Sequence, residues 1–464
     1  MPPRSTPHGG ETERAGTARR RAGRLAACAA ALAVAFTAGA VVLGTGSGDP
    51  ATTASVPATA PQLLAGGDLT AQISGDLTAR ISALQSHLRA QPKDFTSWAT
   101  LGVAYVEQAR TEGDPSRYPQ AERALDRSLS LRPGNDPALA GRAALAAARH
   151  DFRGALRHAE RALAENPYNE RALSSRIDAL VELGRYDKAL RDADEADARR
   201  PGIPVFTRYA YVQELRGDVP AARRVLRRAL ASATAPGDVA YVATALARLA
   251  WQQGEYGTAL KHFARALGAD PAYVPALEGR ARAQAAGGET AEAIRGLEQV
   301  VARYPLPGPL VELGELYEAE GEQGKAREQY DLIDAWTGLA RANGVNADLD
   351  TALAAADHGD RKAALRAARA EWSRRHTVHT ADALAWALHV NGRDKEALPY
   401  ARRAASTGFR DATFLYHRGL IEHATGDTAA ARRSLESALR LNPGFSPVGS
   451  RVAREMLAGL GGAR

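Results

Sequence analysis

The chain has 464 residues, 45% hydrophobic and 24% charged, with a net charge of +7 and a single cysteine. These values exclude a disulfide-stapled mini-protein and a cysteine-ligated metal protein, because Cys28 has no second cysteine to join it. The apolar content is that of a globular protein, which excludes disorder throughout. A positive net charge favours an anionic partner only where the charge lies on the folded part of the chain, so the position of the charged residues decides what the net charge implies.

Most of the excess positive charge lies in residues 1–24. Six arginines there stand against two glutamates, a net charge of +4, which leaves +3 for all the rest of the chain. The rest is therefore close to neutral, with its arginines interspersed among Glu and Asp, and this argues against a nucleic-acid partner. The six arginines are Arg4, Arg14, Arg19, Arg20, Arg21 and Arg24.

An uncharged segment of 19 residues, 25–43, follows the arginines. A basic stretch before an apolar run is typical of a signal peptide or a membrane anchor, and the positive-inside rule places residues 1–24 in the cytoplasm. The segment is barely long enough to span a membrane, and Ala38-Gly39-Ala40 suits signal peptidase, so anchored and cleaved forms both stay open. Either way we expect an extracytoplasmic protein, with residues 44–67, rich in Gly, Ala, Thr and Pro, as a flexible linker.

An internal period of about 34 residues runs through the rest of the chain. Its strongest marker is a set of ten alanines: Ala121, Ala155, Ala189, Ala222, Ala259, Ala293, Ala326, Ala364, Ala397 and Ala431. Five residues before eight of them lies a glycine: Gly184, Gly217, Gly254, Gly288, Gly321, Gly359, Gly392 and Gly426. We interpret each unit as two short amphipathic helices that cross closely at the alanine, with the glycine ending the first helix in a left-handed conformation.

Three units carry the fullest set of recurring residues. The first has Trp98, Leu101, Gly102, Tyr105, Ala121, Leu125 and Pro133; the seventh has Leu310, Leu313, Gly314, Tyr317, Ala326 and Tyr330; the tenth has Leu415, Gly419, Ala431, Leu435, Ala438 and Pro443. This pattern resembles the tetratricopeptide repeat family, and the whole chain resembles exported actinobacterial proteins of that family whose role is not established.

The resemblance implies an all-α fold, an α-solenoid wound as a right-handed superhelix of about ten 34-residue helix-turn-helix repeats and preceded by the N-terminal signal or anchor helix. The array would occupy residues 93–445. Residues 68–92 and 446–464 would form its capping helices.

Two places depart from the regular period. The first inter-helix turn has a seven-residue insertion around Gly113-Asp114-Pro115. After Ala326 the closing proline is missing for three units, and the second helix is predicted to run on to Asn343-Gly344. We expect residues 331–350 to bend the superhelix or to separate two sub-arrays.

Signatures of chemistry are scarce. No HExxH, GxSxG or GxGxxG occurs, and His376 and His379 lack carboxylates at metal-ligand spacing. We therefore expect no catalytic residue, no metal and no cofactor. The alternative is an enzyme with an unrecognised site near the irregular residues 331–380.

The resemblance also implies that the first helix of each unit lines the concave side of the superhelix. Projecting the positions outside the packing signature gives a set of groove-binding candidates: Tyr211, Tyr241, Arg248, Trp251, Arg282, His379, Asp382, Trp386, His389, Tyr416 and His423, with Glu214, Thr244 and Glu278 beside them. Aromatic and Arg side chains dominate binding hot spots, which favours a protein or an extended peptide as partner. For Trp251 and Trp386, packing between units is an equal alternative. Ten stacked units bury a continuous core, so we expect a monomer.

Overall fold

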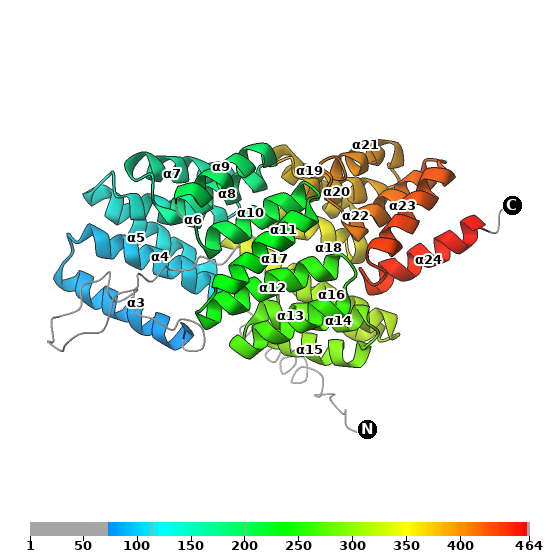
Figure 1. Ribbon diagram of the computed structural model, residues 1–464, viewed down its shortest axis with the longest axis horizontal. Helices are drawn as coiled ribbons and strands as arrows, with labels where there is room; N and C mark the ends of the chain where they lie inside the picture. Colours follow the sequence, from blue (N-terminus) through cyan, green and yellow to red (C-terminus); the bar gives the residue numbers. More distant parts are fainter. Residues whose placement is uncertain (1–72, 113–114, 200, 462–464) are drawn as a thin grey trace, which may run out of the picture.

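The computed structural model describes residues 73–112, 115–199 and 201–461. Over these residues the chain forms helices α3 to α24 and one 3-10 turn, η1, without any strand (Figure 1). The predicted all-α solenoid is confirmed. The predicted signal or anchor segment and the linker lie outside the described residues, and none of the helices that are described is both long and apolar enough to cross a membrane.

Helix α3 (Ile73–Ala90) comes first and packs on α4, and α24 (Pro447–Gly461) comes last. Between them lie ten helix pairs, which we number as units 1 to 10: α4 (Phe95–Glu112) and α5 (Tyr118–Leu131); α6 (Asp136–Ala148) and α7 (Phe152–Glu165); α8 (Glu170–Glu182) and α9 (Tyr186–Arg199); α10 (Ile203–Leu215) and α11 (Val219–Ser232); α12 (Pro236–Gln252) and α13 (Tyr256–Ala269); α14 (Val274–Ala286) and α15 (Thr290–Arg303); α16 (Pro307–Ala319) and α17 (Gln323–Ala342); α18 (Asp348–His358) and α19 (Arg361–Arg374); α20 (Val378–His389) and α21 (Asp394–Ala404); α22 (Ala412–Ala424) and α23 (Thr428–Leu441). The turn η1 (Pro115–Arg117) lies within the insertion of unit 1.

Small residues let the two helices of a unit approach each other. All ten recurring alanines are at most 2% exposed. A Cβ atom added at Gly102 would lie 2.5 Å from Leu125 Cγ, and one at Gly419 would lie 2.7 Å from Leu435 Cγ. Because cores are packed to the density of organic crystals, a larger side chain at these crossings would push the helices apart.

The turns between paired helices show how each first helix ends. Seven of the eight predicted glycines have a positive φ, which confirms the left-handed conformation there. The prediction is wrong at Gly359, whose φ of −143° is extended. In unit 2 the same place is taken by His150 with a φ of 59°, a conformation that costs a non-glycine residue about 1 kcal/mol.

Helix α17 departs from the repeat, since it continues to Ala342 and ends before Gly344, whose φ is 76°. Its extension buries Trp336 and Ala340 in one apolar cluster with Tyr105 of unit 1. The irregular end of unit 7 is therefore packed against the first units of the array.

The superhelix also contacts itself in a second region, where its early units meet its late units. The turns of units 2 to 5 meet the loops that follow units 7 to 10, and Figure 1 shows α8–α11 beside α19–α22. We call this contact the lateral interface: residues 149–152, 182–186, 216–217 and 251–256 against 344–346, 374–378, 408 and 441–446. Its hydrogen bonds join residues close to 190 positions apart, such as Val378 N to Tyr186 Oη at 3.0 Å and Asn442 Nδ2 to the Trp251 carbonyl at 3.0 Å.

Candidate functional site

Side chains from the first helices of distant units face one another on the inner side of the superhelix. Arg248 of α12 acts electrostatically on Glu214 of α10 and on His379 of α20. Tyr273, just before α14, is likewise within electrostatic range of Arg110 of α4. The inner face therefore gathers groups from units 1, 4, 5, 6 and 9.

The middle units bring several predicted residues together. The Tyr241 hydroxyl donates to Thr207 Oγ1 at 3.2 Å, and burial raises the pKa of Tyr241. The Arg282 guanidinium lies 5.2 Å from the Trp251 ring centroid, a cation–π contact between consecutive units. Tyr241, Arg248 and Trp251 all remain partly exposed. Trp251 thus packs on the next unit and still presents part of its ring.

In the C-terminal units, three of the predicted groove-binding residues are buried between helices. Asp382, Trp386 and Tyr416 are only 2%, 6% and 8% exposed. The His417 ring stacks on Trp386 at 4.1 Å, and its Nδ1 lies 2.9 Å from Asp382 Oδ2. These contacts run between units 9 and 10 and leave little surface for a partner. Trp386 therefore packs between units.

The predicted histidines do not form one cluster. His379 lies 5.6 Å from the rings of Phe409 and Phe414, and burial together with Arg375 lowers its pKa to about 4, so it is neutral at pH 7. His389 pairs with Asp394 at 2.5 Å, and His423 is exposed.

Of the remaining predicted residues, some are buried and others are partly exposed. Tyr211 packs, half-buried, against the apolar cluster of units 2 to 4. Thr244 is buried, and its hydroxyl donates to the Ala240 carbonyl at 2.7 Å. Arg282 donates to Glu278 at 2.8 Å and also pairs with Glu312.

The inner face also carries a row of seven carboxylates, of which the sequence analysis named Glu214, Glu278 and Asp382 and missed the other four. We call it the acidic band: Glu214, Glu278, Glu312, Glu315, Asp357, Asp382 and Asp411. Electrostatic interactions connect Glu278 to Glu312, Glu312 to Glu315, Glu315 to Asp357, Asp382 to Asp411, and Asp411 to Glu214. One signal was present, because Glu278 and Glu312 are one repeat period of 34 residues apart.

Several carboxyl groups of the band resist ionisation. Burial raises the pKa of Glu214 to about 7, although Arg248 opposes this rise. Burial likewise raises the pKa of Glu312, an effect that Arg282 opposes and Glu278 reinforces. The pKa values of Asp357 and Asp411 are raised by burial too. Carboxylates in this state gain free energy when a cation is placed beside them.

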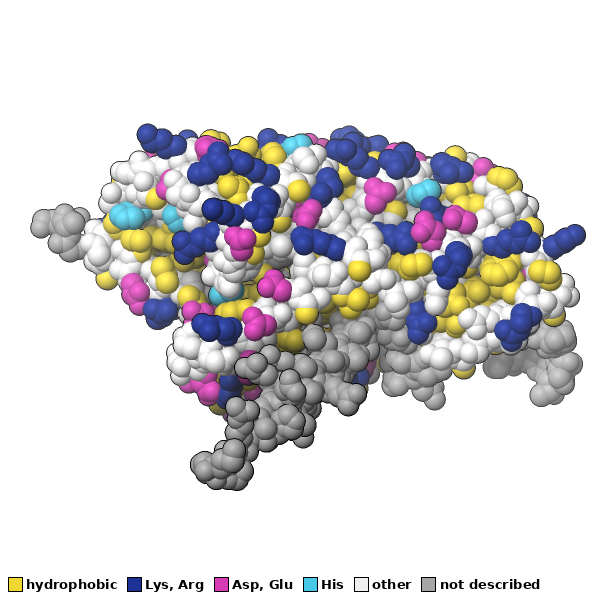
Figure 2. Space-filling model, turned by 180° about the vertical axis from the view of Figure 1, so that it is seen from behind, with side chains coloured by type: hydrophobic (Ala, Val, Ile, Leu, Met, Phe, Trp, Pro, Cys, Tyr) yellow, Lys and Arg dark blue, Asp and Glu magenta, His cyan; other side chains and the backbone are white. Residues whose placement is uncertain are grey.

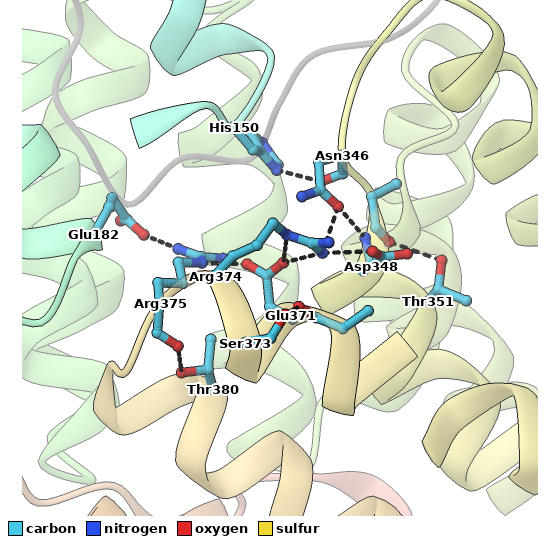
Figure 3. A network of polar contacts seen from close by, with 12 residues as sticks. His150, Glu182, Asn346, Asp348, Thr351, Glu371, Ser373, Arg374, Arg375 and Thr380 are labelled. Carbon is cyan, nitrogen blue, oxygen red and sulfur yellow. Dashed lines mark hydrogen bonds and ion pairs between the residues drawn. The ribbon is translucent and has the colours of Figure 1, made fainter. Parts of the chain in front are cut away.

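The lateral interface, by contrast, contains a connected network of paired polar side chains (Figure 3). Arg375 is 6% exposed and pairs with Glu371 and with Glu182 of α8. Arg374 donates to Asn346 Oδ1 at 2.8 Å, and the Asn346 carbonyl lies 2.7 Å from His150 Nδ1. Burial lowers the pKa of His150 to about 4, so this ring is neutral at pH 7. These polar groups lie in and beside residues 331–380, the region of the alternative enzyme site. Their contacts join the early units of the array to the late ones.

Over the residues that the structure describes, no three or more His, Cys, Asp or Glu side chains gather as a metal would require.

Comparison with known proteins supplies the family. Two tetratricopeptide repeat models match the sequence, one at residues 250–311 and the other at 139–204, 215–274 and 384–444. The chain is a tetratricopeptide repeat protein. Such repeats generally mediate protein–protein interaction and belong to scaffolds rather than to enzymes. A search of curated proteins gave no match.

The chain is also similar, at low sequence identity, to several solved structures. A human IFIT1 dimer with m7Gppp-AAAA is 17% identical, with 80% of this chain and 87% of that chain covered and a TM-score of 0.46. A thermophilic protein from Thermus thermophilus is 23% identical over 41% of this chain and 98% of that chain, with a TM-score of 0.37. One from Parabacteroides merdae ATCC 43184 is 20% identical over 56% and 98%, with a TM-score of 0.33.

Proposed function

We propose that this tetratricopeptide repeat protein is a non-catalytic scaffold outside the cytoplasm that holds a protein or an extended peptide on the inner face of its superhelix. The observation that carries the proposal is the convergence of Tyr241, Arg248 and Trp251 in adjoining turns of α12, each partly exposed and facing side chains of other units. Aromatic and Arg side chains that keep exposed surface in a concave setting are the usual anchors of protein partners.

The proposed location outside the cytoplasm rests on the N-terminal sequence. Six arginines before the uncharged segment 25–43 are the arrangement that directs export with the N-terminus inside. Mass spectrometry of the N-terminus in membrane and culture-supernatant fractions tests this. A chain that begins near residue 41 in the supernatant indicates cleavage, a full-length chain in the membrane indicates an anchor, and a chain found only in the cytosol contradicts export.

Binding is tested by photo-crosslinking in the cells that make the protein. A benzophenone amino acid replaces Tyr241 on the inner face or, as a matched control, Tyr168, a tyrosine that is 64% exposed in the loop between α7 and α8. We expect a discrete adduct from position 241 and none from 168, and we expect Arg248→Ala/Trp251→Ala to reduce it. Equal adducts from both positions, or an adduct unaffected by the double variant, would contradict inner-face binding.

A further inference from the structure

The acidic band is bordered by buried polar atoms that have no hydrogen-bond partner in the described fold. His358 of α18 is the clearest case. Its side chain is only 10% exposed, its ring stacks on Tyr330 at 4.0 Å, and its Nε2 is buried without a hydrogen-bond partner. Nε2 points towards Glu315, with Oε1 at 3.8 Å, too far for a hydrogen bond. Buried polar atoms are almost always paired in proteins, so an orphan of this kind calls for an explanation.

Glu312 supplies a second orphan on the same side. Its Oε1 pairs with Arg282, whereas its Oε2 is buried and has no hydrogen-bond partner. Glu315 lies one helical turn further along α16, and Asp357 precedes His358 on α18. Two buried polar atoms without partners, one on α16 and one on α18, therefore border one stretch of the band.

The charge balance of the band identifies what would pair with the free Glu312 oxygen. Against seven carboxylates stand the two arginines Arg248 and Arg282, and His417, which is already paired with Asp382. The face of the molecule in Figure 2, in contrast, mixes many Lys and Arg side chains with acidic ones. The acidity is thus a local property of the band, and the missing component is positively charged and carries N–H donors.

We infer that the acidic band binds an extended, lysine- or arginine-bearing segment of a partner protein, with one cationic side chain donating to Glu312 and Glu315 beside His358. This inference rests on the proposed function and names the chemistry of the partner. The partner segment has to be extended because the carboxylates follow one another from α14 to α22 around the superhelix, one or two to a unit.

The test uses the purified full chain and short fluorescent peptides in which Ser alternates with Lys, Gln or Glu. Fluorescence anisotropy should show binding of the Lys peptide, with the Gln and Glu peptides at least about tenfold weaker. Glu312→Gln/Glu315→Gln should weaken the Lys peptide about tenfold, because it removes two acceptors of the bound cation. The control Glu320→Gln/Glu436→Gln makes the same change in net charge at two exposed positions and should leave the affinity unchanged.

Folding and specificity are checked by a second variant and by the melting curve. Asp357→Asn lies on a different helix, and its amide oxygen can still accept from Trp386 Nε1, so it loses charge without a packing change and should also weaken the Lys peptide. Equal losses in the Glu312/Glu315 variant and in the control would assign the attraction to overall charge and overturn the inference. Loss of binding accompanied by a lowered melting temperature in the first variant, but unchanged affinity in Asp357→Asn, would overturn it as well.

Two further outcomes separate this inference from the proposed function. A Gln peptide that binds as tightly as the Lys peptide, and that is lost in Arg248→Ala/Trp251→Ala, refutes the cationic partner and keeps inner-face binding. A Lys peptide that binds only after the six arginines of residues 1–24 are replaced by Gln assigns the band to the N-terminus of the same chain, which overturns a separate partner. If no peptide binds and position 241 yields no adduct, the proposed function fails too.

Discussion

The lateral interface and the acidic band are both built from polar side chains of distant units, yet the central charged groups are paired at the interface and only partly paired in the band. At the interface, Arg375 meets Glu371 and Glu182, and the Asn346 carbonyl meets His150. In the band, Glu312 and His358 each keep a buried atom without a partner. Paired charges hold the fold together at the interface, whereas an unpaired carboxylate oxygen in the band is a place where a cation is expected to bind.

The two regions also show that burial alone does not decide the role of a carboxylate. Glu371 is 2% exposed and sits between Arg374 and Arg375. Glu214 is more exposed, but its pKa is raised to about 7 because Arg248 compensates only part of its desolvation and Asp411 adds repulsion. The balance of nearby charge separates a structural carboxylate from one that awaits a cation.

The largest effect is expected from Arg375→Ala at the interface. The change leaves Glu371 and Glu182 as buried carboxylates without their shared partner and also removes the contact with the Phe152 ring. Breaking a buried pair from one side costs about 3–5 kcal/mol. Urea unfolding followed by circular dichroism measures it, with Arg393→Ala, in an exposed pair with Glu396, as the control expected to change stability by less than about 0.5 kcal/mol. Similar midpoints for the two variants would show that the interface does not stabilise the array.

A smaller loss is expected from Gly217→Ala, which tests the backbone contact at the interface. Gly217 has a φ of 83°, and an added Cβ would lie 2.5 Å from the carbonyl oxygen of Gly408. Gly426 is the matched control, because its φ is 91° and an added Cβ would meet nothing within 4 Å. We expect about 1–2 kcal/mol from the left-handed conformation in Gly426→Ala and about 1–2 kcal/mol more in Gly217→Ala. Equal losses would mean that the turns move apart freely, and the interface would then be adaptable instead of fixed.

The units themselves were predictable from sequence because their contacts are local. The recurring alanines mark the helix crossings, and the glycines mark the turns, so each unit is specified within about 34 residues. Gly359 fails the rule in the irregular stretch after α17, where Asp360 caps α19 by accepting from Lys362 N and the turn takes an extended form.

The lateral interface could not be predicted from the repeat pattern of the sequence. Its partners, such as His150 and Asn346, are 196 residues apart, and their meeting depends on the small rotation between every pair of units in between. The band was partly accessible through the spacing of Glu278 and Glu312. Asp357 and Asp411 could not be projected, because Asp357 follows the irregular end of α17 and Asp411 caps α22 from the preceding loop.

The smallest effect, and the one that contrasts the two regions most directly, is expected from replacing a carboxylate by its neutral amide in each. The pKa of Glu214 rises from its ordinary 4.5 to about 7 in the folded protein, so the folded state binds a proton more tightly than the unfolded state. The contribution of Glu214 to stability is therefore present below about pH 4.5 and is lost as the pH rises through 7. Glu214→Gln stays neutral, which removes this loss.

At pH 8 we expect Glu214→Gln to be more stable than the native protein by up to about 1 kcal/mol, because solvent screening reduces the full effect, and we expect the difference to shrink towards pH 5. The groups that face Glu214 are Arg248 and Gln252 of α12 and Asp411 before α22, and they stay unchanged in the variant. Glu371→Gln should do the opposite and destabilise at pH 8, since it deprives Arg374 and Arg375 of their carboxylate. Thermal melts of both variants at the two pH values decide between these signs. Destabilisation by Glu214→Gln at pH 8 would make the band a structural network like the interface, and the case for a cationic partner would lose its electrostatic basis.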